Sequence, residues 1–106
     1  MECLRVTGDL DREVTRIGTM VGGLGLDRHI DAWVAELLPL GVQLIIAGET
    51  NDFAQRFALE AGIGLIETCH SASEEPGLRV LAADLERAYP EVPVVFHPLP
   101  VPWRTV

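Results

Sequence analysis

Apolar residues recur along the chain in two patterns, and each pattern predicts one kind of element. Some stretches have apolar residues every three or four positions, as at Ile30, Val34 and Leu37, and this spacing is typical of one face of a helix. Other stretches are short continuous apolar runs, such as VQLIIA at residues 42–47, which suit a strand buried on both faces. Strands and helices alternate, which predicts an α/β protein.

Gly and Pro mark the boundaries of these elements. The predicted helices cover residues 27–38, 52–61 and a third segment that starts at Pro76, where a missing N–H costs nothing, and ends before Pro90. The predicted strands cover residues 3–6, 15–21, 42–47, 63–66 and 92–96, with Pro93 placing the last of them at or near an edge. We therefore expect a single domain over residues 1–106, with three helices and a mainly parallel sheet of about five strands.

Charge and composition exclude several classes of function. The hydrophobic share of 48% and the charged share of 23% are those of a folded protein. The net charge of -8, with eight scattered arginines and no lysine, argues against nucleic acid as a partner. No apolar run reaches the roughly 20 residues of a membrane span, and the N-terminus lacks a signal-peptide pattern. Two lone cysteines, Cys3 and Cys69, form no disulfide framework, so we expect a cytoplasmic protein.

Three loops follow the carboxyl ends of predicted strands, where ligands gather in open parallel sheets. They read GGLGLD (residues 22–27), GETND (residues 48–52) and ETCHSASEE (residues 67–75). In and beside them lie the residues best suited to catalysis or ligand binding, namely Asp27, His29, Glu49, Asp52, Cys69, His70, Glu74 and Glu75. Topology alone therefore predicts a site at this rim of the sheet.

The glycine loop has two interpretations. Gly22, Gly23 and Gly25 either form a tight structural turn or let an anion such as a nucleotide phosphate approach the backbone N–H groups. The dinucleotide fingerprint fails in its spacing, and no lysine is present for a Walker loop.

His70 and Glu74 are four residues apart in the third loop. A single pair of this kind is commonly an ordinary hydrogen-bonded loop. Imidazole and carboxylate are nevertheless a proper ligand combination for zinc, iron or manganese.

Several segments resemble one known family in the correct order. The stretch GLIETCHSASEEPGLRVLAADLE resembles the C-terminal signature of the NGG-one-interacting factor three-like family, a pattern like G-H-x-A-T-E followed by a Gly-Leu helix. LIIAGETND resembles the family's preceding strand ending in T-G-E, with Ala47 in place of Thr. VTRIGTMVGGLG resembles the strand and glycine turn that open the second half, and VVFHPLPVPW resembles the tail. The resemblance covers residues 4–103.

The resemblance implies a metal-binding protein. Family members are α/β proteins of two related halves, often assembled into hexameric rings, and they bind a pair of divalent metal ions between the halves. The His and Glu of their signature are metal ligands, which assigns that role to His70 and Glu74. Many members are labelled homologues of GTP cyclohydrolase type 2, and the implied activity is that of a metal-dependent hydrolase.

This sequence departs from the family in its remaining ligands. The family's adjacent His-His pair and an Asp belong to the first half, and this chain has no His-His, so it resembles the second half only. Two ligands are fewer than a tightly held zinc-type ion needs. We therefore expect a homo-oligomer or a partner chain to supply the missing half, unless Asp27 and His29 substitute locally. His97 is expected to be a strand-end residue.

Two residues beside the pair have alternative roles. Cys69 replaces the family's usual glycine, and its thiol is either an inert space-filler, a ligand for a soft metal or a nucleophile. Glu49 is either a catalytic general base next to a metal-bound water or a cap for the helix beginning near Asn51 or Asp52.

Three functions compete at this point. The first is a metal-dependent hydrolase that uses His70 and Glu74. The second is a non-catalytic assembly or binding module that has lost the first-half ligands. The third is a nucleotide-binding protein that uses the glycine loop.

Overall fold

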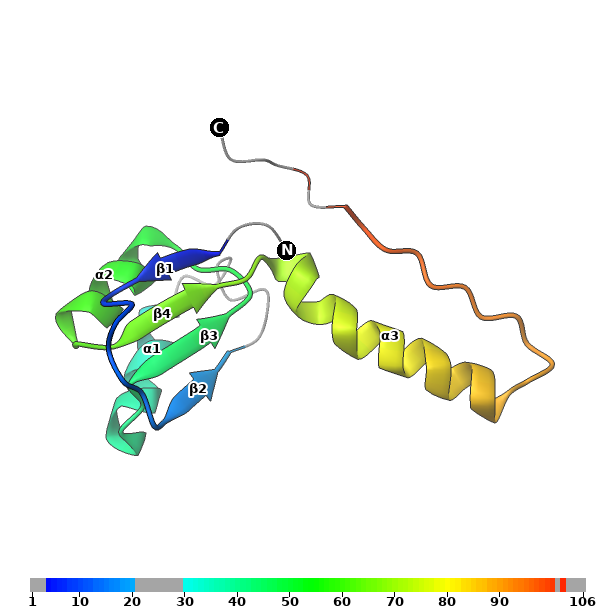
Figure 1. Ribbon diagram of the computed structural model, residues 1–106, viewed down its shortest axis with the longest axis horizontal. Helices are drawn as coiled ribbons and strands as arrows, with labels where there is room; N and C mark the ends of the chain where they lie inside the picture. The colour runs from blue at the N-terminus through cyan, green and yellow to red at the C-terminus, as the bar shows by residue number, and fades with distance from the viewer. Residues whose placement is uncertain (1–3, 21–29, 101, 103–106) are drawn as a thin grey trace.

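The chain folds into a four-stranded sheet with two helices on one face and a third helix that projects away from it (Figure 1). The structure is a computed structural model and describes residues 4–20, 30–100 and 102. The elements are β1 (Arg5–Thr7), β2 (Ile17–Thr19), α1 (Ile30–Leu37), the 3-10 turn η2 (Leu38–Leu40), β3 (Leu44–Ala47), α2 (Asp52–Glu60), β4 (Gly64–Glu67) and α3 (His70–Ala88).

The sheet is mostly parallel, as the sequence predicts. Its strand order is β1-β4-β3-β2, with β2, β3 and β4 parallel and β1 antiparallel to β4. The α/β class and the three helices are therefore confirmed, and the described residues form four strands where about five were expected.

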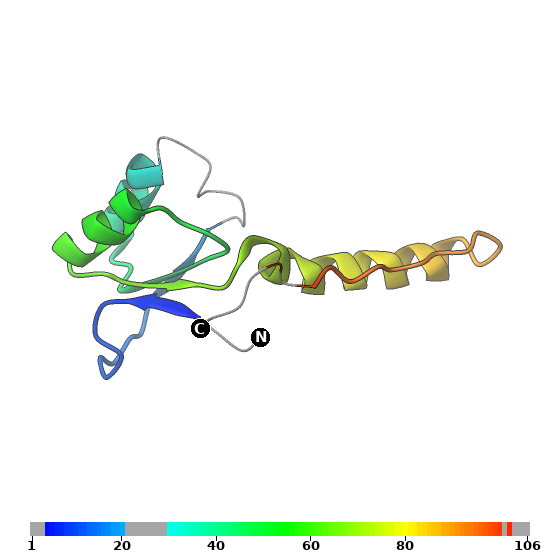
Figure 2. The same cartoon turned by 90° about the horizontal axis from the view of Figure 1, so that it is seen from above.

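The core lies between the sheet and the pair of helices α1 and α2. Ile45 and Leu65 are paired neighbours on β3 and β4, and both are fully buried. They pack against Ala54 and Ala58, which are four residues apart on one face of α2, and against Val34 of α1. Figure 2 shows both helices on the same side of the sheet.

Helix α2 has a defined start and a defined end. Asn51 caps it, because its side-chain oxygen accepts a hydrogen bond of 2.9 Å from the backbone N–H of Ala54. Asn51 therefore fills the capping position that was one of the two alternatives for Glu49. At the other end Gly62 adopts a φ of 71°, which turns the chain into β4.

The third helix starts earlier than the sequence predicts. The expected start at Pro76 is wrong, because α3 begins at His70 and Pro76 lies inside it. The first turn is already closed upstream of the proline, since the Ser73 N–H donates to the Cys69 carbonyl at 3.0 Å. Pro76 has no N–H to donate to the Ala72 carbonyl, which is a local loss that the helix tolerates.

Helix α3 projects from the sheet as an arm (Figure 1). None of its 19 residues is buried, and its large apolar side chains Leu78, Val80, Leu81 and Leu85 are all exposed. The radius of gyration is 16.4 Å, whereas a compact chain of this length has about 13 Å. None of the described helices has the length and apolar character needed to cross a bilayer.

The expected fifth strand at residues 92–96 is wrong. This segment belongs to a tail that turns after Tyr89, where the Val92 N–H donates to the Tyr89 carbonyl at 2.9 Å, and then runs back past α3 (Figures 1 and 2). Residues 93–100 form no strand. The arm carries them away from both edges of the sheet, and Pro93 and Pro98 each lack a backbone donor.

Candidate functional site

The parallel strands β3 and β4 end together and bring their following residues to one rim. Ala47 is paired with Glu67 at the carboxyl ends of these strands, and the Thr68 N–H extends the ladder with a 2.9 Å bond to the Ala47 carbonyl. Glu49 follows β3 by two residues and His70 follows β4 by three. The pairing therefore brings these two side chains, which are 21 residues apart in sequence, into contact.

His70 lies between two carboxylates. Its Nδ1 is hydrogen-bonded to Glu49 Oε1 at 3.1 Å, and its Nε2 lies 3.1 Å from Glu74 Oε1. Glu74 reaches the ring because α3 begins at His70, so the two residues are four apart on one helical face. The three side chains are only partly exposed, with 37% of the His70 side chain accessible.

The two carboxylates raise the pKa of His70 above its usual value of 6.5. The hydrogen bond to Glu49 is the largest cause, and the charge of Glu74 acts in the same direction, while partial burial opposes both. Each carboxylate stabilises the protonated ring, since the imidazolium carries a proton on both nitrogens.

The loop that carries Glu49 is held by a carboxylate that the sequence analysis missed. Glu67 Oε2 accepts hydrogen bonds from Thr50 Oγ1 at 2.7 Å and from Gln55 Nε2 at 3.2 Å, and Arg5 Nη1 donates to the same atom at 3.3 Å. Only 11% of the Glu67 side chain is exposed. The signal in the sequence is an acidic residue at the end of the buried run IGLIE, where an isolated charge would be costly.

Cys69, immediately before α3, has a strained backbone. Its φ of 75° and ψ of 138° lie in a region that residues with a Cβ rarely adopt. The thiol is partly buried and lies 3.8 Å from the Ser71 hydroxyl. A glycine, which the motif resemblance implies for this position, would adopt such angles at little cost.

The other residues singled out in the sequence are not part of this cluster. Asp52 pairs with Arg56 at 2.8 Å and Glu75 pairs with Arg79 at 2.6 Å, each on its own helix surface. His97, which lies in the tail, shares a cavity wall with Glu74. Gly22, Gly23, Gly25, Asp27 and His29 lie outside the described residues.

The cluster does not form a complete metal centre. Within residues 4–20, 30–100 and 102, no three His, Cys, Asp or Glu side chains are arranged to hold one ion. The three side chains do not converge on one point, because Glu49 and Glu74 face different nitrogens of the same imidazole ring. Each ring nitrogen is paired with one carboxylate oxygen at 3.1 Å, so the cluster offers two donors, not three, on either side of the ring.

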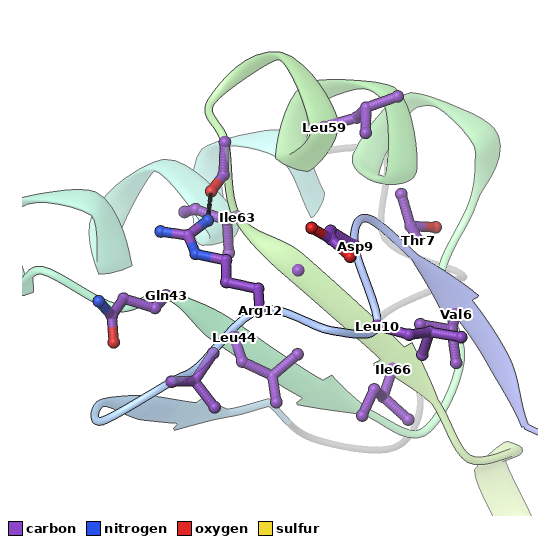
Figure 3. Close-up of a pocket in the computed structure, with 13 residues that line it drawn as sticks. Val6, Thr7, Asp9, Leu10, Arg12, Gln43, Leu44, Leu59, Ile63 and Ile66 are labelled. Atoms are coloured by element: carbon purple, nitrogen blue, oxygen red, sulfur yellow. Dashed lines mark hydrogen bonds between the residues drawn. The ribbon is translucent and has the colours of Figure 1, made fainter.

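A separate cavity of about 320 Å³ lies between the β1–β2 connection and the start of β3 and β4 (Figure 3). Its lining is mainly apolar, and three of its polar side chains already have hydrogen-bond partners. Arg12 donates to the Gly62 carbonyl, Asp9 accepts from the Asp11 N–H at 2.9 Å, and Gln43 accepts from the Thr15 N–H at 2.8 Å. With these three side chains engaged, few polar groups of the cavity are left to converge on a ligand.

The fold and the cluster define an α/β protein with a candidate cation site at the carboxyl ends of parallel strands. The sequence matches the model of the family described as Duf34/NIF3 (NGG1p interacting factor 3) over residues 1–100. The chain belongs to the DUF34/NIF3 family, as the resemblance of its motifs indicates. A comparison with curated proteins finds no match.

Solved structures with the same fold are much longer than this chain. A Bacillus cereus protein related to NIF3 is 17% identical with a TM-score of 0.68, and the match covers 85% of this chain and 23% of that chain. Staphylococcus aureus protein SA1388 is 16% identical with a TM-score of 0.72, and the match covers 99% of this chain and 34% of that chain. The chain therefore spans about a quarter to a third of the length of these proteins, which fits the expectation that it corresponds to part of the family fold.

We expect the pKa of His70 in the metal-free protein to lie above 6.5 and to fall in Glu49→Gln, because that substitution removes the largest cause of the shift. The protonated ring stabilises the folded state fully below pH 6.5, and this contribution is lost as the pH rises through the higher folded-state pKa. NMR titration of the imidazole in chelator-treated protein measures both values. An unchanged pKa in Glu49→Gln would show that the contact with Glu49 does not act on the ring.

Cys69→Gly is expected to raise the free energy of unfolding by about 1 kcal/mol, because relief of backbone strain exceeds the entropic cost of a glycine. Cys69→Ala is the matched control, since it removes the thiol and keeps the Cβ. Urea denaturation followed by circular dichroism gives the comparison. Equal stabilities of the Gly and Ala variants would contradict the assignment of strain to position 69.

Proposed function

We propose that this chain is a divalent-cation-binding member of the DUF34/NIF3 family. In this proposal His70 Nε2 and Glu74 Oε1 hold the ion, and Glu49 positions the imidazole. The observation that carries the proposal is the row of carboxylate, imidazole and carboxylate, with a 3.1 Å contact at each ring nitrogen. Zinc, iron and manganese all accept this pair of donors.

The spacing of the two donors supports the proposal. Zinc binds a His nitrogen at about 2.0–2.1 Å and a carboxylate oxygen at about 2.0–2.2 Å, so two donors of one tetrahedral site lie roughly 3.3 Å apart. The separation of 3.1 Å between His70 Nε2 and Glu74 Oε1 is close to this value. Little rearrangement of the chain would be needed for both atoms to contact one ion.

Glu49 fits a positioning role better than a catalytic one. Metal-binding histidines commonly donate their second ring N–H to a carboxylate, which fixes the tautomer and the orientation of the ring. Glu49 faces Nδ1 in this way and leaves Nε2 for the cation. The general-base role stays a prediction, and the position of Glu49 on the far side of the ring from Glu74 argues against it.

The remaining donors would come from outside the pair. Catalytic zinc sites have three protein ligands and an open position, and this pair supplies two. A second copy or a partner chain that corresponds to the missing part of the family fold would bring the others. A cation held there would supply Lewis acidity toward a carbonyl or phosphoryl group, which is the basis for a metal-dependent hydrolase.

Zinc binding tests the proposal directly. We expect the purified chain to bind Zn²⁺, His70→Ala to lose binding, and Glu49→Gln to weaken it about 10–100-fold through disorder of the ring. Isothermal titration calorimetry and metal analysis measure these effects. Glu86→Gln, at an exposed position of α3, is the matched control and should bind as the unaltered chain does. Absence of binding in the unaltered chain would end the proposal.

The second candidate function is a non-catalytic assembly module, and the exposed arm is the observation that favours it. Leu78, Leu81 and Leu85 follow one stripe of α3, and each is between 42% and 53% exposed. A largely exposed apolar stripe of this kind is commonly an interaction surface. The chain would then act by joining a second copy or a partner chain through α3.

A charge placed on the stripe should separate the two candidates. If α3 mediates assembly, Leu81→Asp should turn an oligomer into a monomer, whereas Ala83→Asp places the same charge on another side of the exposed helix and should leave the oligomer intact. Sedimentation velocity measures the mass of each species. A monomeric unaltered chain at high concentration would remove self-assembly through the arm from consideration.

A further inference from the structure

The face of the sheet that points away from α1 and α2 is apolar and only partly covered. Side chains alternate between the two faces of a strand, so the residues next to the fully buried Ile45 and Leu65 point to this second face. With the residues paired to them on the edge strands, they are Leu44, Ile46, Ile66, Val6 and Ile17. The three on β3 and β4 are partly exposed, and the two on β1 and β2 are 38% and 52% exposed.

An apolar face of this kind calls for a second layer. Parallel strands with apolar side chains on both faces are normally covered on both. Figure 2 shows α1 and α2 on one side of the sheet, and none of the described helices lies on the other. Only the β1–β2 connection approaches that side.

The cavity of Figure 3 opens on the same face. Val6, Leu44 and Ile66 line it from the sheet, and Leu10 lines it from the β1–β2 connection. Leu10 is 77% exposed. Because three polar side chains of the lining are already hydrogen-bonded, the hollow suits an apolar side chain of a protein partner better than a polar ligand.

Helix α3 carries a surface that fits this face. Leu81 and Leu85 lie on one side of the helix and are 53% and 42% exposed, and Tyr89 directly after it is 55% exposed. A helix of 19 residues is about 28 Å long, whereas the outer strands of a four-stranded sheet lie roughly 14 Å apart. The arm is therefore long enough to cover the sheet.

The helix does not cover the sheet of its own chain. Only two residues separate β4 from α3, and both sides of this link are held. The Thr68 N–H donates to the Ala47 carbonyl at 2.9 Å, and His70 Nδ1 is hydrogen-bonded to Glu49. The helix leaves the sheet at the rim, as Figures 1 and 2 show. Its apolar side is thus available to a second copy, and every copy brings both surfaces.

The exposed area of the chain is large enough for such a contact. The chain exposes 7768 Å², whereas a compact monomer of its mass of 11.6 kDa exposes about 5,800 Å². The difference of about 1,900 Å² exceeds the roughly 800 Å² that each partner contributes to a stable interface of standard size.

We propose that α3 of one copy packs across the open sheet face of a second copy, with leucine side chains of its stripe in the cavity beside Leu10. The inference rests on the second candidate function, assembly through α3, and it names the partner and the surface that receives the arm. The arm then forms the layer that the sheet lacks, as α1 and α2 do on the other face. Each contact removes two apolar surfaces from water.

A charge on the receiving surface tests the inference in the full chain. Leu10→Asp is expected to raise the dissociation constant of the assembly at least 10-fold, because it places a carboxylate in an apolar hollow. Leu10→Ser should act in the same direction by a smaller factor. Phe53→Asp is the matched control, since Phe53 is 78% exposed but lies on α2, on the other side of the sheet. Sedimentation equilibrium measures the constants, and far-UV circular dichroism verifies that each variant is folded.

A mixture of two variants tests whether the arm meets this face. Leu81→Asp keeps an intact sheet face and Leu10→Asp keeps an intact arm, so the mixture can form one unaltered contact that neither variant forms alone. We expect monomers in the separate samples and mixed species after combination. Labelling one variant with ¹⁵N lets native mass spectrometry identify the mixed species.

The outcomes distinguish this inference from the function on which it depends. If Leu81→Asp is monomeric but Leu10→Asp assembles as the unaltered chain does, or if the mixture forms no mixed species, the sheet face is not the receiving surface and assembly through α3 still stands. A monomeric unaltered chain, or a Leu81→Asp variant that still assembles, overturns both. Dissociation in Leu10→Asp but not in Phe53→Asp, together with mixed species, supports the inference.

Discussion

The parallel pairing of β3 with β4, in the register that sets Ala47 opposite Glu67, determines which side chains meet at the rim. Burial fixes this register. Ile45 and Leu65 are opposite each other and fully buried, and a slip of one residue would turn a buried side chain to the other face of the sheet. The apolar core therefore controls the approach of Glu49 to His70, although neither residue belongs to it.

Much of the fold could be predicted from the sequence, because its central elements follow local patterns. The strands β3 and β4 and the helices α1 and α2 have the periods, caps and glycine turns that such elements need. The sequence-based predictions are wrong where a local sequence rule is overridden by structure formed by neighbouring segments of the chain. Pro76 marks a helix start by local rule, but the turn upstream of it is already closed by the Ser73–Cys69 hydrogen bond.

The tail shows the same limit in a different form. The run VPVVF has the composition of a strand, but a strand exists only where another strand's edge is within reach. Because α3 extends for 19 residues away from the sheet, it removes this segment from both edges. Local composition cannot supply that information, since it depends on the direction in which the preceding helix leaves the sheet.

The candidate site was predictable in part. The spacing of His70 and Glu74 is visible in the sequence, and so is the rim on which parallel strands end. The contact of Glu49 with His70 is not, because it follows from pairing between segments that are 21 residues apart. The network around Glu67 and the left-handed backbone of Cys69 also depend on tertiary structure.

The arm begins at the residues that would hold the ion, so its contacts and the ion's environment share the same first turns of α3. This arrangement has a thermodynamic consequence. Suppose that a partner packs along the arm and favours the ion-bound arrangement. That partner must raise the affinity for the ion by the same factor by which the ion raises the affinity for the partner, because such coupling is reciprocal. Binding of the ion at the rim and binding of the partner along the arm would then each favour the other.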